Sequence, residues 1–115
     1  MKISYVLAAV LLSTSVAAAP ADDKQIEGFS QLVAVAMEAV SACPNEELDP
    51  DGFAPSMKAL GITAEDLPKV ARDFQTTKPA AQVLRARSGD REFCRFAVPI
   101  LTGQGDSLVH LIRLK

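Results

Sequence analysis

The chain has 115 residues, a formal net charge of −2 at pH 7 and only 5% aromatic residues. This length has room for one small domain and excludes a second. Acids dominate from Asp22 to Asp51 and bases from Lys69 onward, but the bases are spread out with few aromatic residues between them. No nucleic-acid partner is therefore expected. The two halves are expected to pack together, with their charges facing water or each other.

The first residues have the layout of an export signal. Lys2 supplies a positive charge, Val6–Leu12 is a short apolar run, and Ser13–Ala21 is a stretch rich in small residues. This order is typical of a cleaved signal peptide, and the apolar run is shorter than the ~20 residues of a membrane-spanning helix. We predict a signal peptide over residues 1–21, with cleavage after Ala18 or Ala21. The mature domain would then comprise residues 22–115, in the periplasm or secreted, with no stable membrane anchor after cleavage.

Cys43 and Cys94 are the only cysteines in the chain. Export brings a protein into an oxidising compartment, where two cysteines are expected to pair. A Cys43–Cys94 disulfide would close a long loop and stabilise the domain by about 4 kcal/mol in the chain-entropy description. The two cysteines do not have Cys-x-x-Cys spacing, so we expect a structural disulfide rather than a redox site.

The segment from Asp22 or Asp23 to Cys43 is predicted to be one amphipathic helix. Its apolar residues recur at helical spacing and are Ile26, Phe29, Val33, Ala36, Met37, Val40 and Cys43. Pro44 is expected to end the helix, because proline disfavours helical geometry in the residue before it. The Cys43 thiol should therefore point into the core.

Pro44–Gly52 reads as an acidic connector. Asp49–Gly52 resembles part of an EF-hand loop, but Lys58 would then occupy the position that should supply a bidentate glutamate. We therefore expect a turn and no metal site.

The middle of the chain is predicted to be helical. Phe53–Leu60 forms a short helix, and Gly61 suits its C-terminal left-handed position. Thr63–Asp66 has the pattern of a capping box, although the regular helix could instead begin at Leu67 with Asp66 as its cap.

The next stripe consists of Leu67, Val70, Ala71 and Phe74. Thr76–Pro79 is expected to kink or interrupt this helix. A further segment, Pro79–Arg87, should use Val83 and Leu84 as its apolar contacts.

Two more helices are predicted at the C-terminal end. Phe93, Cys94, Ala97, Val98 and Leu101 form a strong inward face, which Phe96 and Ile100 would widen, with a bend at Pro99. Ser107–Leu114 fits a helix or a strand. We expect a helix, because no second strand is evident and a lone strand leaves its backbone unsatisfied. The predicted fold is all-α, a small single-domain helical bundle with one disulfide.

No catalytic residues are predicted. His110 is the only histidine and lies between leucines on a terminal amphipathic segment, where a structural role is expected. The carboxylates cluster in an acidic loop without the apolar surroundings that raise a pKa for acid–base catalysis. No cofactor is expected. The five phenylalanines are expected in the core, with an apolar groove for a partner as the alternative.

A resemblance adds to this interpretation. It lies in the leader, a helix ending in Cys43-Pro44, the segment Lys58–Leu67, Glu92-Phe-Cys94, a glycine turn and a leucine-rich end. Through these features the chain resembles a family of small exported alphaproteobacterial proteins of unknown function. Pro99 departs from the uninterrupted helix of that family. The resemblance implies export and a disulfide, and no activity.

We therefore expect an exported, non-enzymatic binding or interaction module with an unknown protein partner in the cell envelope. The alternative is an acid-stress periplasmic chaperone (a holdase), because at low pH the acidic half would lose its charge while the basic half kept it. A small hydrolase is least favoured, and the oligomeric state is left open.

Overall fold

The computed structural model describes residues 20–104 and 109–115. These residues form a single, mostly helical domain with one short two-stranded sheet, so the predicted all-α class is confirmed. Most of the predicted leader, residues 1–19, and the Ser107 end of the predicted last helix lie outside the described residues. None of the described helices is long and apolar enough to cross a bilayer.

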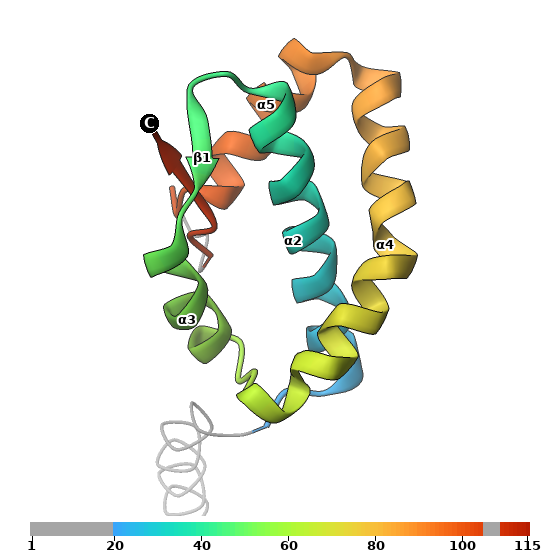
Figure 1. Cartoon of the computed structure of the whole chain (residues 1–115), viewed down its shortest axis with the longest axis vertical. Helices are drawn as coiled ribbons and strands as arrows, with labels where there is room; N and C mark the ends of the chain where they lie inside the picture. Colours follow the sequence, from blue (N-terminus) through green and yellow to red (C-terminus); the bar gives the residue numbers. More distant parts are fainter. Residues whose placement is uncertain (1–19, 105–108) are drawn as a thin grey trace, which may run out of the picture.

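The helix α2 (Asp23–Ala42) is central to the fold. In Figure 1 it lies between α4 (Leu67–Ser88) on one side and β1 (Glu46–Leu48) with α3 (Pro50–Ala59) on the other. α5 (Asp90–Leu101) packs against both α2 and α4. The apolar core therefore forms around α2.

α2 begins and ends close to where the sequence predicts. The Asp22 side chain accepts a hydrogen bond from the Gln25 backbone N–H at 2.8 Å, and the Gln25 side chain accepts one from the Asp22 N–H at 2.9 Å. This reciprocal pair satisfies two backbone donors at the helix start. Ile26 and Phe29 are buried as predicted, whereas Met37 is 44% exposed and does not belong to the inward face.

The disulfide joins Cys43 to Cys94, as predicted, with 5.8 Å between the two Cα atoms. Cys43 directly follows α2 and Cys94 lies in the first half of α5, so the bond fixes the end of one helix to the other. Phe93, Ala97 and Leu101 are buried on the inward face of α5. The helix continues through Pro99 to Leu101.

The segment between α3 and α4 resolves an open alternative. Both hydrogen bonds of the Thr63–Asp66 capping box form, and a 3-10 helix, η2 (Ala64–Asp66), follows Thr63. The regular helix α4 then begins at Leu67. Both readings of this segment are therefore partly right.

The predicted interruption of the helix at Thr76–Pro79 is wrong, because α4 runs without a break from Leu67 to Ser88. Pro79 is exposed, and α4 is anchored to α2 before it: Ser30 Oγ lies 3.1 Å from the Val70 carbonyl oxygen. Ala81 is buried after it. Packing on both sides of the proline holds the helix together despite the lost backbone hydrogen bond.

The predicted helix at the C-terminal end is also wrong. Ile112–Leu114 forms a strand, β2, that pairs antiparallel with β1, so that Glu46 lies opposite Leu114 and Leu48 opposite Ile112. The dark red C-terminal strand beside β1 is visible in Figure 1. The acidic connector thus supplies the partner strand that the sequence did not reveal.

The core is smaller than the apolar pattern predicts. Phe29 and Phe93 are buried, but Phe96 is 51% exposed and Ile100 is also exposed, so neither widens the inward face of α5. Val83 and Leu84 on α4 are likewise exposed rather than core contacts. The core is instead completed from the terminal segment, where Leu111 and Ile112 are fully buried.

Candidate functional site

A cavity of about 430 Å³ lies where the β1–β2 sheet, here called the terminal sheet, meets the end of α5. Its lining combines ionisable, polar and apolar side chains: Glu46, Val98, Thr102, Gln104, His110, Arg113 and Leu114. A volume of this size is within the range of about 300–1,000 Å³ that is usual for small-molecule sites. The cavity depends on β2, because the sheet brings the C-terminal residues beside β1 and α5.

Glu46 is the most unusual residue of this cavity. It is only 6% exposed, and its Oε2 is the one buried side-chain oxygen or nitrogen in the described part of the chain that has no hydrogen-bond partner. Burial raises the pKa of the Glu46 carboxyl above its ordinary value. A buried acceptor without a donor costs free energy, so this atom points to a missing partner.

Arg113 and His110, the two basic residues of the lining, already have acidic partners. Arg113 Nε donates to Glu47 Oε2 at 2.8 Å, and this hydrogen bond raises the pKa of the arginine. His110 Nε2 lies 3.3 Å from Asp49 Oδ2, and Arg113 also approaches the other Asp49 oxygen at 3.5 Å. Both side chains therefore face acids that lie outside the lining, and neither donates to Glu46 Oε2.

Ser56, His110 and Asp49 bring together the residue types of a hydrolase triad, but their geometry is different. The Ser56 hydroxyl donates to the Gly52 carbonyl oxygen at 2.7 Å and accepts from the His110 backbone N–H at 2.9 Å. A catalytic serine must instead bond to the imidazole that takes its proton. Ser56 is 1% exposed and connects α3 to the terminal segment.

The predicted turn over Pro44–Gly52 is wrong, because strand β1 and the first residues of α3 occupy most of this segment. Asp49 is the N-cap of α3, its side chain accepts from the Asp51 N–H at 3.0 Å, and Pro50 begins the helix. Gly52 is therefore helical rather than part of a loop. Within residues 20–104 and 109–115, no three His, Cys, Asp or Glu side chains are grouped to hold a metal ion.

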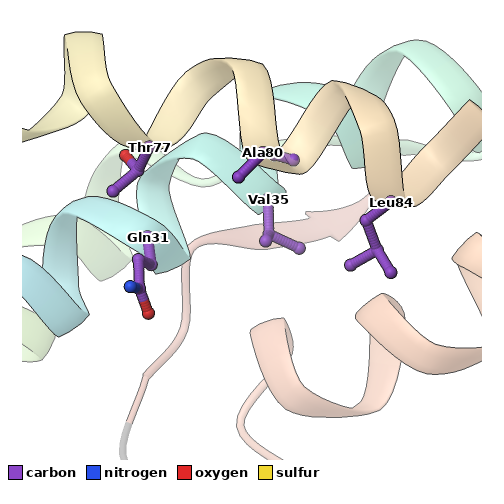
Figure 2. A pocket seen from close by; sticks show the side chains of 6 residues that line it. Gln31, Val35, Thr77, Ala80 and Leu84 are labelled. Carbon is purple, nitrogen blue, oxygen red and sulfur yellow. The ribbon is translucent and has the colours of Figure 1, made fainter.

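A second hollow lies between α2 and α4 and is mostly apolar. Figure 2 shows Gln31 and Val35 of α2 facing Thr77, Ala80 and Leu84 of α4. Its volume is about 180 Å³, which is below the usual range for a small-molecule site. The Thr77 hydroxyl is already satisfied by the carbonyl oxygens of Phe74 and Ser30. This hollow offers a ligand apolar contact and little specificity.

Sequence reasoning found some of these residues and missed others. Cys43 and Cys94 form the predicted bond, and His110 lies at the sheet with its side chain about half exposed. Glu46 was not singled out, because it is one of several acids in the connector. Glu46–Leu48 holds one apolar residue and no apolar–polar alternation, so the local sequence contains no signal for a strand there.

No protein-family model, no curated protein and no solved structure matches this chain.

Proposed function

We propose that this chain is an exported, non-enzymatic binding protein that holds a small polar ligand in the cavity between the terminal sheet and α5. The proposal rests on Glu46, which is among the residues that line this cavity. Its buried Oε2 receives no hydrogen bond within the described residues. Buried polar groups are almost always hydrogen-bonded, so an exception needs an explanation, and a functional role for the group is one. The leader layout and the disulfide support a location in the periplasm or outside the cell.

The composition of the cavity also favours binding over chemistry. Val98 and Leu114 offer apolar contact, while Thr102 and Gln104 add polar groups near the rim. The Ser56 hydroxyl is committed to backbone groups, so it is not activated by His110 as a nucleophile. A protein partner in the cell envelope stays a prediction from the sequence.

A fragment titration followed by ¹H–¹⁵N NMR tests the proposal. The oxidised protein, uniformly labelled with ¹⁵N, is mixed with small amines, carboxylates, alcohols and amides one at a time. We expect at least one class to shift the backbone amides of Glu46, Thr102, His110 and Arg113 together. Shifts confined to the α2–α4 hollow, or no saturable shift with any class, would remove the cavity as the binding site.

A holdase is the second candidate, and the ion pairs between the acidic and basic parts of the chain favour it. Lys69 lies 3.9 Å from Asp23, Arg85 lies 3.6 Å from Glu38, and Arg113 contacts Glu47. Protonation of these carboxylates would leave the bases of α4 and β2 without their partners and repelling one another. Loosening of the helices would then add buried apolar residues such as Phe29 and Phe93 to the surface that unfolded clients can bind.

Client aggregation measured at about pH 3 and about pH 7 separates this candidate from the first, because carboxylates lose their charge between these values. A holdase suppresses aggregation only in acid, whereas a ligand-binding protein protects clients at neither pH.

A further inference from the structure

We infer that the ligand of this cavity is a small organic ammonium ion whose charged group pairs with Glu46 and whose hydrocarbon part packs on Val98 and Leu114. This inference rests on the proposed function and names the class of ligand. It follows from the charges and contacts of the cavity, taken one group at a time.

First, the atom without a partner, Glu46 Oε2, lacks a hydrogen-bond donor. An ionised carboxylate has acceptor sites only, and Glu46 Oε2 receives no hydrogen bond within the described residues. A ligand that presents only acceptors, such as a carboxylate or a phosphate, would place like charges together. The ligand group beside Glu46 must therefore carry N–H or O–H.

The second step is that the ligand donor should be charged. Arg113 contacts Glu47 and also approaches Asp49 and Asp51, and His110 approaches Asp49. These acids offset the positive charge at the rim, so the carboxyl of Glu46 is left without a compensating cation. Burying a charge is costly unless it is paired. An ammonium group supplies both the donor and the opposite charge, whereas an alcohol supplies the donor alone.

The third step concerns access. Glu46 Oε2 is closed to bulk water, but the last torsion of a glutamate side chain is broad. Because Glu46 is among the residues that line the cavity, rotation about this torsion is the route by which its carboxylate would meet a ligand there. Leu114, which lies opposite Glu46 in the sheet and is 72% exposed, is then placed to cover the hydrocarbon part of the ligand.

The titratable groups around Glu46 predict how binding responds to pH. His110 and Arg113 are the titratable side chains that line the cavity with it, and α5 contributes the uncharged Val98 and Thr102. Burial raises the pKa of Glu46, so acidification neutralises its carboxyl already above the ordinary glutamate value of 4.5. A neutral carboxyl no longer pairs with a cation, so ammonium binding should be lost in acid.

Three probes of similar size and different charge test the inference: n-butylammonium, butan-1-ol and pentanoate. Each is titrated by NMR into the wild-type protein, Glu46→Gln and the control Glu65→Gln, which makes the same charge change at an exposed site on η2. We expect butylammonium alone to shift the cavity amides. Its affinity should fall at least about tenfold in Glu46→Gln and stay unchanged in Glu65→Gln.

The outcomes separate this inference from the proposed function. Saturable binding of pentanoate or butanol at the same amides, without butylammonium, would overturn the ammonium class and leave the binding site standing. Equal binding of butylammonium to wild type and Glu46→Gln would overturn the role of the carboxylate. No shift of the cavity amides with any probe, and none in the wider fragment titration, would overturn both.

Discussion

Gly52 of α3 and His110 of the terminal segment are in such close contact that a side chain at position 52 would overlap the His110 carbonyl oxygen. We therefore expect Gly52→Ala to displace the terminal segment and to lower the free energy of unfolding by about 1–3 kcal/mol. Urea unfolding measures this change. Gly28→Ala is the matched control, because a Cβ there meets nothing within 4 Å and alanine stabilises a helix interior by about 0.5–1 kcal/mol. Equal stability of the two variants would contradict the contact.

Ser56 is predicted to fix the same junction through its hydroxyl. Ser56→Ala removes the hydrogen bond to the Gly52 carbonyl oxygen and leaves the His110 N–H without its acceptor. We expect a loss of about 1–3 kcal/mol and faster hydrogen exchange at His110. Unchanged exchange at this amide would show that the hydroxyl does not hold the terminal segment.

The strands β1 and β2 show where the sequence is informative and where it is not. α2 and the disulfide were predictable, because a long apolar stripe, a capping aspartate and Pro44 all indicate the same helix. Glu46–Leu48 carries too few apolar residues to read as a strand, and its partner β2 is three residues long. Each strand is stabilised only by the other, so a local pattern could not reveal either.

The cavity was unpredictable for the same reason. Glu46 becomes buried only because β2 and α5 meet beside it, and one acid among several has no distinguishing local signal.

Pro79 shows the opposite case, in which a strong local signal is overruled, because contacts with α2 hold α4 together on both sides of the proline.

Glu46 should make the protein less stable at neutral pH than in mild acid. Burial raises its pKa, so the folded state favours the neutral carboxyl. The stabilisation that the neutral Glu46 carboxyl gives the folded state is complete below pH 4.5, the ordinary glutamate pKa. It is lost as the pH rises through the raised pKa of the folded state. Glu46→Gln removes that loss, and we expect it to be more stable than wild type at neutral pH.

Urea unfolding across this pH window measures the effect, which should vanish below 4.5. Glu47→Gln is the matched control: it makes the same charge change at the neighbouring residue. Because it removes the partner of Arg113, it should not stabilise the protein. A stabilisation of Glu46→Gln that is independent of pH would contradict this explanation.

We expect the loss of either cysteine to lower the free energy of unfolding by a similar amount. Cys43 and Cys94 are separated by 51 positions in the sequence, and a loop of this length corresponds to about 4 kcal/mol in the chain-entropy description. Cys43→Ser and Cys94→Ser should therefore lose similar stability, and reduced wild type should resemble both. If a reductant leaves the free energy of unfolding of the wild-type protein unchanged, the disulfide does not stabilise the domain.

The predicted leader also has a structural consequence. The Ala21 N–H donates to the Gly61 carbonyl oxygen at 3.0 Å, and Ala21 packs against the core. Cleavage after Ala18 keeps this contact, whereas cleavage after Ala21 removes it. We expect the intact mass of the exported protein to correspond to a chain that begins at Ala19. A chain that begins at Asp22 would contradict this expectation.

The most direct test of the account is the titration of the Glu46 carboxyl carbon, followed by ¹³C NMR in the oxidised protein with and without butylammonium. The account predicts a pKa above 4.5 in the free protein and a lower one when the ammonium ion is bound, because the bound cation favours the charged carboxylate. An ordinary glutamate pKa that does not respond to the amine would contradict both the buried, unpartnered carboxylate and the ligand inferred from it.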